Sequence, residues 1–381
     1  MPMNTTADDA APAGVAPVPP MPAIPAVPSS PMPPGAVTGP AAWTGEAMRK
    51  APERWTFSLD AAELAEIEAA TAAIERSGAP LGAISPATFP ARKLAERLEW
   101  LLEHQLLSGL GFAVLRGLPV DDLTIEQAAI AYLGVGSHLG SFRSQNAKGH
   151  LLGHVRDLGL DIREKSTRYY QTTRQLDYHT DSCDIVGLLC LKTSKSGGAS
   201  RIVSSVTLYN EILARRPDLL PELFHAFHTD RRGEIPPGKL PWFEIPVFNW
   251  FEGHLSAIYA GQYIRSAQFN HPGARRLTER EHEALDLLDT LADDPRLRLE
   301  MAFSPGDMQF LHNHQVFHSR TDFEDWPEPE RKRHLLRLWL SPPSGRPLPQ
   351  AYADRYGSIM PGERGGILTS QTELKFVTTP E

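Results

Sequence analysis

The sequence is poor in cysteine, has no surplus of positive charge and contains no long apolar run. Only two of its 381 residues are cysteines, Cys183 and Cys190. On a shared strand, at ~3.3 Å per residue, their Cα atoms would lie too far apart for a disulfide. The net charge of −8 argues against a nucleic-acid-binding protein, because phosphate backbones are bound by excess Lys and Arg. No apolar segment approaches the ~20 residues that span a membrane, so we expect a soluble protein without a membrane partner.

The first part of the chain also lacks Lys and Arg, neither of which occurs before Arg49. Signal peptides begin with basic residues and transit peptides are rich in arginine, so we expect a cytoplasmic protein. Residues 1–40 contain 12 prolines and 8 alanines and almost no large apolar side chains. This composition predicts a disordered tail of polyproline character, and a dispensable tail is favoured over a docking ligand.

A second proline-rich boundary lies near Ser341, where Pro342-Pro343-Ser344-Gly345 follows. It separates a folded domain over residues 41–341 from a C-terminal extension over residues 342–381. The sequence contains no internal repeat, so the middle region is interpreted as one domain.

Helix patterns come first in this domain and strand patterns come later. Asp60 and Glu63 form a capping-box pattern before an apolar repeat that ends at Gly78. Further helices are expected over Leu94–Leu106 and Thr124–Leu133. Apolar segments between turn signals predict strands over Phe112–Arg116, Ile185–Leu191, Val247–Trp250, His254–Tyr259, Met308–Phe317 and Leu335–Leu340. The order favours a mainly β domain with flanking helices, an α+β fold with a largely antiparallel sheet.

The pattern His-x-Asp occurs twice, and a chain with 14 histidines contains such a pair by chance. His228 with Asp230 follows a stretch interpreted as a helix, where a cationic side chain near the C-terminal end stabilises the helix dipole. His179 with Asp181 precedes an apolar strand instead. On an extended chain, residues i and i+2 face the same side, so this imidazole and this carboxylate can bind one metal ion.

A third ligand is expected on a later strand. His312, His314 and His318 share one parity in the stretch from Gly306 to Thr321, which includes the predicted strand Met308–Phe317, so strand geometry does not choose among them. His318 lies nearest to the polar end of that strand, which suits a ligand at the mouth of a barrel. Two histidines and one carboxylate form the facial triad that holds Fe(II) and leaves coordination positions open.

Two arginines near the end of the domain indicate an anionic cosubstrate. Arg333 and Arg337 share a face of the last predicted strand with Trp339, while the leucines of the other face suit a helix-covered core. Buried guanidinium groups need an anion, and their fork matches a carboxylate. A dicarboxylate would supply that anion.

Several motifs together resemble one known family. They are Tyr178-His179-Thr-Asp181, Gly197-Gly198-Ala-Ser200, Gly306-Asp307, Asn313, His318-Ser-Arg-Thr321 and Arg333-x-x-x-Arg337, and the likeness extends from about Trp43 to Leu340. The chain resembles the taurine dioxygenase/TfdA family of Fe(II)- and 2-oxoglutarate-dependent oxygenases, the group that includes clavaminate synthase.

The resemblance implies a double-stranded β-helix, or jelly roll, in which His179, Asp181 and His318 bind iron. It further implies that Arg333 and Ser200 hold the distal carboxylate of 2-oxoglutarate, and that Arg337 lies near its inner carboxylate or the substrate. The segment between His318 and Arg333 is longer than in the shortest relatives, which leaves the roles of the two arginines open.

The implied reaction consumes 2-oxoglutarate and O2, releases succinate and CO2, and hydroxylates or desaturates an unactivated C–H bond. Asp181 favours this outcome over halogenation, because related halogenating enzymes have a small residue in its place. The substrate is expected to be a small molecule, carboxylated or otherwise anionic. Candidate substrate contacts are Gln175, Tyr178, Arg143, Asn146 and Arg265.

Two alternatives compete with this interpretation. One is a jelly-roll binding protein without catalysis, and the other is a redox-neutral metal hydrolase or lyase that uses the same triad. Hydrolysis has no use for buried arginines that bind a cosubstrate, so Arg333 distinguishes these classes. The oligomeric state, monomer or homo-oligomer, stays open.

Overall fold

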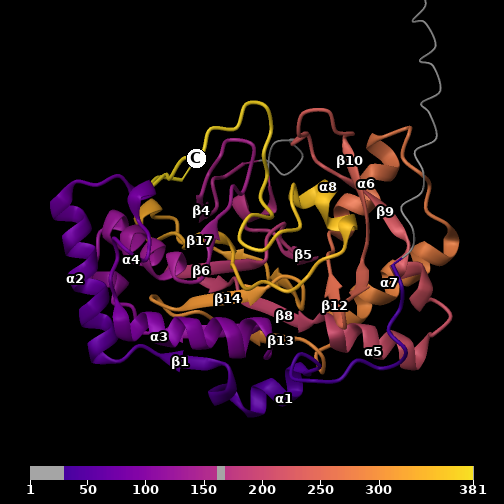
Figure 1. The fold of residues 1–381 in the computed structure, drawn as a ribbon, viewed down its shortest axis with the longest axis horizontal. Helices are drawn as coiled ribbons and strands as arrows, with labels where there is room; N and C mark the ends of the chain where they lie inside the picture. Colours follow the sequence, from indigo (N-terminus) through magenta and orange to yellow (C-terminus); the bar gives the residue numbers. More distant parts are fainter. Residues whose placement is uncertain (1–29, 161–167, 381) are drawn as a thin grey trace, which may run out of the picture.

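The computed structural model describes residues 30–160 and 168–380, and its centre is a pair of facing β-sheets (Figure 1). The larger sheet has the order β1 (Thr56–Ser58), β2 (Phe112–Arg116), β14 (Met308–His312), β6 (Ile185–Lys192), β17 (His334–Ser341) and β3 (Ser141–Phe142), with β4 (Leu152–Val155) also paired to β17. The smaller sheet has the order β13 (Leu299–Met301), β8 (Ser200–Ser204), β15 (Val316–Arg320) and β5 (Leu176–His179). Strands β1 and β2 pair in parallel, and the other pairs in these sheets are antiparallel.

Three apolar clusters hold the layers together, one between the sheets and one on the outer face of each. Phe112, Val186 and Trp339 of the larger sheet meet Ile202 and Val316 of the smaller sheet in the middle cluster. Helices α2 (Ala61–Ser77), α3 (Arg92–Trp100) and α4 (Ile125–Ser137) cover the larger sheet, and a π-helical turn over Leu101–Leu107 continues α3. Helices α5 (Ser205–Arg215), α6 (Gly261–Asn270) and α7 (Glu279–Ala292) cover the smaller sheet. This is the predicted jelly roll with flanking helices, and Figure 1 shows the two helix groups on opposite sides of the strands.

The remaining elements are short. They are α1 (Gly45–Lys50), α8 (Ala353–Tyr356), the strand pairs β9 (Ala226–Asp230) with β10 (Trp242–Pro246), β11 (Phe248–Phe251) with β12 (His254–Ala257) and β7 (Ser196–Gly197) with β16 (Phe323–Glu324), and single 3₁₀ turns. Within the two described ranges, no helix combines the length and the apolar character needed to cross a bilayer.

Local sequence signals located several of these elements correctly. The Asp60 carboxylate accepts a hydrogen bond from the Glu63 backbone N–H at 3.1 Å, and the Glu63 carboxylate accepts one from the Asp60 N–H at 2.9 Å. Gly78 closes α2 with a φ of 63°, a conformation that glycine adopts without steric cost. Cys183 and Cys190 are both free thiols in the interior, as expected, and Asn313 Nδ2 donates a hydrogen bond to Cys183 Sγ at 3.2 Å.

Two expectations about local structure are wrong. The predicted strand Met308–Phe317 is two strands, because the chain reverses between β14 and β15 at residues 313–315. Asn313 N–H donates to the Asp184 carbonyl at 2.9 Å, and Gln315 N–H donates to the His312 carbonyl at 3.0 Å. The stretch before His228 is a 3₁₀ turn rather than a longer helix, and His228 lies inside β9, where backbone pairing with β10 outweighs helical preference.

Both chain ends pack more closely than their composition suggests. Residues 1–29 of the predicted tail lie outside the described residues, but the segment that follows contacts α5. Asn210 Oδ1 accepts from the Val37 N–H at 2.9 Å, and Tyr209 OH donates to the Gly35 carbonyl at 3.0 Å. At the other end of the chain, residues 342–380 run over one end of the two sheets (Figure 1). Tyr352 and Tyr356 of this segment are buried.

A buried ion pair fixes this C-terminal segment to the sheets. Arg364 Nε lies 2.8 and 3.0 Å from the two Asp184 carboxylate oxygens, and neither side chain is exposed. The same carboxylate accepts from Ser341 Oγ at 2.8 Å and lies 2.8 Å from His314 Nε2. The four residues come from β17, the β14–β15 turn, the position before β6 and the C-terminal segment. One carboxylate therefore joins elements that are distant in the sequence.

We expect Arg364→Leu to destabilise the protein by ~3–5 kcal/mol, because it leaves the Asp184 charge buried without its cationic partner. Chemical denaturation measures the change in the free energy of unfolding. Arg280→Leu is the control, since it breaks the exposed Arg280–Glu222 pair of 2.9 Å and should leave that free energy nearly unchanged. Equal effects of the two substitutions would contradict the anchoring role of Asp184.

Buried histidines make stability depend on pH. Burial lowers the pKa of His312 far below its usual range, lowers that of His314, and lowers that of His334 to about 3. Between these values and the ordinary pKa of ~6.5, the unfolded chain binds protons that the folded chain does not, so stability falls on acidification. Each such histidine changes the free energy of unfolding by up to ~1.4 kcal/mol per pH unit. Urea unfolding between pH 7 and pH 5 should show a shallower dependence for His312→Gln than for the wild type, and equal slopes would contradict this.

Candidate active site

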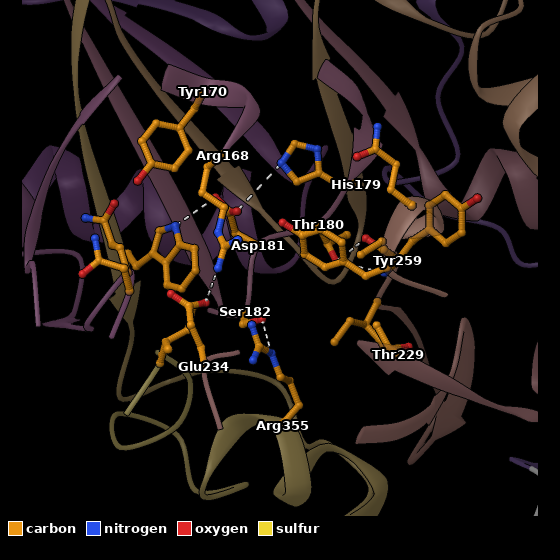
Figure 2. A pocket seen from close by; sticks show the side chains of 18 of the residues that line it. Arg168, Tyr170, His179, Thr180, Asp181, Ser182, Thr229, Glu234, Tyr259 and Arg355 are labelled. Carbon is orange, nitrogen blue, oxygen red and sulfur yellow. Dashed lines mark hydrogen bonds and ion pairs between the residues drawn. The ribbon is translucent and has the colours of Figure 1, made fainter. Parts of the chain in front are cut away.

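A cavity of about 260 Å³ opens between the two sheets at the end covered by the C-terminal segment. Figure 2 shows His179, Thr180 and Asp181 along one part of its wall, with Arg168, Glu234 and Arg355 on another. Its other polar lining includes Gln145, Asn146, Lys148, His150, Asp177, Tyr263 and Arg337. The cavity therefore combines the predicted metal-ligand segment with groups from distant parts of the chain.

The structure brings His179, Asp181 and His318 together, and the first two line this cavity. Antiparallel pairing of β5 and β15 sets His179 directly opposite His318, with ring centroids 4.2 Å apart. Asp181 Oδ1 lies 3.9 Å from His179 Nε2, and Asp181 Oδ2 lies 3.8 Å from His318 Nε2. One potential ligand atom from each residue lies within 4.8 Å of the others. Two imidazole nitrogens and one carboxylate at this spacing suit a single metal ion on one face of the triad.

Hydrogen bonds orient two of these side chains. His179 Nδ1 lies 2.8 Å from the Asp177 carbonyl oxygen, so Nδ1 carries the proton and the lone pair of Nε2 points toward Asp181. Asp181 Oδ2 accepts from Trp339 Nε1 at 2.8 Å, and the Asp181 N–H donates to Asn313 Oδ1 at 3.0 Å. The triad is thus positioned by groups from both sheets before a metal binds.

The protonation states also suit a metal. Burial alone would raise the pKa of Asp181, but Arg337, His318 and His179 together hold it below its usual range. Burial, followed by the neighbouring His179, lowers the pKa of His318 to about 3. A carboxylate beside a neutral imidazole is the form in which these groups bind metal ions.

The other candidate histidines lie elsewhere. His314 pairs with Asp184 in the interior, and His312 Nδ1 lies 2.6 Å from Gln315 Nε2. The chain reversal therefore distinguishes the candidate third ligands, which strand parity did not, because it places His318 on a different sheet from His312. His228 stacks on Trp242 with centroids 5.5 Å apart and lies 3.2 Å from Glu244.

Arg333 is a buried cation without an ion pair to any carboxylate of the described residues. Its Nη2 lies 3.5 Å from the Gly198 carbonyl, its Nη1 has no hydrogen-bond partner, and no carboxylate of the described chain lies within 4.0 Å of its guanidinium. Burial lowers its pKa to about 10. Ser200 donates to Gln309 Oε1 at 3.2 Å, and neither Arg333 nor Ser200 lines the cavity beside His179.

Arg337 lines the cavity next to the triad. Its Nη1 lies 3.9 Å from Asp181 Oδ2, and its Nε donates to Gln145 Oε1 at 2.7 Å. The guanidinium carbon also lies 4.7 Å from the centroid of the Tyr170 ring. Arg333, the residue before β17, and Arg337, within it, therefore have different surroundings.

The predicted substrate contacts divide into two groups. Asn146 and Tyr178 line the cavity. Tyr178 is also part of the apolar cluster on the outer face of the smaller sheet. Gln175 is exposed outside the cavity. Arg143 donates to Ser141 Oγ at 2.8 Å, and Arg265 bridges Asp286 and Asp289 at 2.8 and 2.9 Å, so neither lines it.

Several lining residues were not identified from the sequence. Arg168 and Glu234 form an ion pair of 3.3 Å, and Arg355 comes from the extension after residue 341. These residues lie more than 60 positions apart and follow no common spacing, so no local signal connects them.

Comparison with known proteins agrees with this site. A model of the taurine catabolism dioxygenase TauD, TfdA family matches residues 75–339. The chain is 33% identical over 320 residues to FR-33289 synthase of Streptomyces rubellomurinus, covering 82% of this chain and 92% of the relative. It is 31% identical over 330 residues to the taurine hydroxylase-like protein SAT17 of Stachybotrys chartarum, covering 81% and 83%.

Solved structures share the fold at lower sequence identity. Asparagine oxygenase, in complex with Fe(II), 2S,3S-3-hydroxyasparagine and succinate, aligns with a TM-score of 0.58 at 18% identity over 75% of this chain and 93% of its own. The non-heme iron oxygenase OrfP, in complex with Fe and alpha-ketoglutaric acid, aligns with a TM-score of 0.56 at 16% identity over 75% and 93%. The family match covers well over half of the sequence, and the chain belongs to the TauD, TfdA family of Fe(II)- and 2-oxoglutarate-dependent oxygenases.

Proposed function

We propose that His179, Asp181 and His318 hold Fe(II), that Arg333 binds the distal carboxylate of 2-oxoglutarate, and that the cavity beside them binds a small anionic substrate for hydroxylation. The observation that carries the assignment of the cosubstrate is the buried Arg333 guanidinium, which has no acidic partner among the described residues. A charge in this position is costly unless an anion neutralises it. A redox-neutral hydrolase or a simple binding protein would not need such a group.

The other cosubstrate contacts follow from the surroundings of Ser200 and Arg337. Ser200 lies opposite Arg320 in the β8–β15 ladder, and its hydroxyl is the proposed second contact of the distal carboxylate. Arg337 lies 3.9 Å from Asp181, which places its charge where an inner carboxylate beside the metal would need it. The proposal therefore assigns the two ends of the cosubstrate to two arginines, one just before β17 and one within it.

Iron with 2-oxoglutarate and O2 supplies the oxidising power for a C–H bond. The protein contributes ligands, orientation and a partly enclosed space. Trp339 and Asn313 keep Asp181 in place through its carboxylate and its backbone N–H. Arg337 is itself held by Gln145, so the charge beside Asp181 has little freedom to move.

An anionic substrate suits the charges of the cavity. Lys148, Arg168, Arg337 and Arg355 line it together with Asp177, Asp181 and Glu234. One relative, 30% identical over 190 residues, is named uridine-5'-phosphate dioxygenase, and it acts on a phosphorylated molecule by that name. We further place the protein in the cytoplasm, where two free buried thiols such as Cys183 and Cys190 are the usual state.

Metal binding tests the triad. We expect His179→Ala and Asp181→Ala each to weaken iron binding by about tenfold or more, because each removes one of three ligands. Iron content after loading with Fe(II) without oxygen and desalting measures this. His228→Ala, which changes the other His-x-Asp pair, should bind iron like the wild type. Loss of iron in the His228 variant would contradict the proposed site.

Cosubstrate binding tests the arginines. Arg333→Leu should weaken 2-oxoglutarate binding by about a hundredfold or more while iron still binds, because a buried charge-assisted pair is lost. The visible absorption band of the iron-bound cosubstrate, followed during an oxygen-free titration, measures the affinity. Arg337→Leu should affect it less. The reverse order would exchange the two roles, and normal binding by both variants would show that neither arginine holds the cosubstrate.

A further inference from the structure

Three arginines line the substrate side of the cavity, and they differ in whether a carboxylate lies close to them. Arg337 lies 3.9 Å from Asp181, and Arg168 lies 3.3 Å from Glu234. Arg355 lines the same cavity, yet within residues 30–160 and 168–380 no carboxylate lies within 4.0 Å of its guanidinium. Of these three arginines, Arg355 is therefore the one that forms no ion pair with a carboxylate of the described residues.

Contacts on one edge and one face fix the position of Arg355. Its Nε donates to Ser182 Oγ at 2.6 Å, and its guanidinium carbon lies 5.1 Å from the centroid of the Phe243 ring. Figure 2 shows Arg355 reaching from α8 to Ser182, below the Arg168–Glu234 pair. Ser182 directly follows the proposed metal ligand Asp181. The guanidinium is thus held beside the metal triad, with its two terminal nitrogens not engaged by a carboxylate.

The next residue along α8 strengthens this placement. Tyr356 OH lies 3.5 Å from the carbonyl oxygens of both Asp181 and Cys183. Adjacent residues of α8 therefore contact three successive residues of the ligand-bearing segment. This makes Arg355 a rigid part of the cavity wall rather than a surface side chain that happens to turn inward.

The energetics favour an anion at this position. Burial lowers the pKa of Arg355, and the more distant Glu234 offsets only part of that effect. A partly desolvated guanidinium gains most from an oxyanion that accepts two parallel hydrogen bonds from its fork. The contact with Ser182 uses Nε and leaves the terminal nitrogens for such a ligand.

We propose that Arg355 binds an oxyanion group of the substrate, such as a carboxylate, sulfonate or phosphonate, and so selects substrates by charge. The inference rests on the proposed function, because it places the substrate beside the iron triad. Arg355 lies outside residues 75–339, the part of the chain that matches the family model. The C-terminal segment thus supplies the proposed specificity residue from outside the range that the family model matches.

Small probes that differ only in their head group test this directly. Acetate, methanesulfonate and methylphosphonate each carry one methyl group and an oxyanion, and acetamide carries a methyl group without charge. The protein is loaded with Mn(II), which relaxes nearby protons and does not support turnover, and is saturated with 2-oxoglutarate. Methyl proton relaxation then reports which probes bind near the metal.

In the wild type, the methyl protons of at least one anion should relax about tenfold faster than those of acetamide. Arg355→Gln keeps a polar contact for Ser182 but removes the charge, and it should lower this effect by about tenfold or more. Arg276→Leu removes the same charge from an exposed position and should behave like the wild type. The anion with the largest effect identifies the head group that the site prefers.

Anions that relax no more than acetamide, or equal relaxation in Arg355→Gln and wild type, would overturn the proposal. If a thermal melt shows that Arg355→Gln is unfolded, Arg355→Lys replaces it. Lysine keeps the charge but lacks the planar fork, so intermediate relaxation is expected and wild-type relaxation contradicts the two-point contact. Failure of Mn(II) to enhance water relaxation in the wild type would instead show that the metal site of the proposed function is wrong.

Discussion

The Asp184 carboxylate, buried without contact to solvent, is the constraint on which the arrangement of the site depends. It is satisfied by a guanidinium, an imidazole and a hydroxyl from three separate parts of the chain, namely Arg364, His314 and Ser341. Because an isolated buried charge is costly, these partners have to arrive together, and the C-terminal segment cannot leave without exposing the pair to water. Asp184 lies three residues after Asp181, so the same anchor fixes the segment that carries this proposed metal ligand.

From this anchor, the sheets place the remaining groups. The β5–β15 ladder sets two imidazoles opposite each other, and β17 of the other sheet contributes Trp339 and Arg337 across the gap. The triad therefore depends on the distance between the two sheets, which the middle apolar cluster maintains. The packing of side chains between the sheets is in this way coupled to the geometry of the triad.

The parts of the fold that the sequence predicted are those with local causes. The capping box at Asp60 and Glu63, the glycine that ends α2 and the alternation in β17 each act within a few residues. The same alternation placed Arg337 and Trp339 on the inward face. His179 and Asp181 were recognised because two residues on an extended segment share a side.

What the sequence did not predict depends on tertiary contacts. The chain reverses at residues 313–315, which are polar but buried. Hydrogen bonds from Asn313 to Asp184 and between Gln315 and His312 make their burial possible. Because these contacts cannot be seen in the sequence, the pattern was indistinguishable from a continuing strand. The cluster of Arg168, Glu234 and Arg355 joins three segments without a shared motif. The structured course of residues 342–380 was hidden in the same way, since its anchor is a pairing 180 residues away in the sequence.

The interior position of Cys183 has a consequence for the durability of the enzyme. Thiolates, rather than thiols, react with the oxidants that iron and O2 produce. Burial raises the pKa of Cys183 well above its ordinary value, and the neighbouring Asp181 and Asp184 raise it further. The sulfur also accepts a hydrogen bond from Asn313 and has no exposed surface. A cysteine two residues from the proposed metal ligand Asp181 is in this way kept as the thiol, the form that reacts slowly with oxidants.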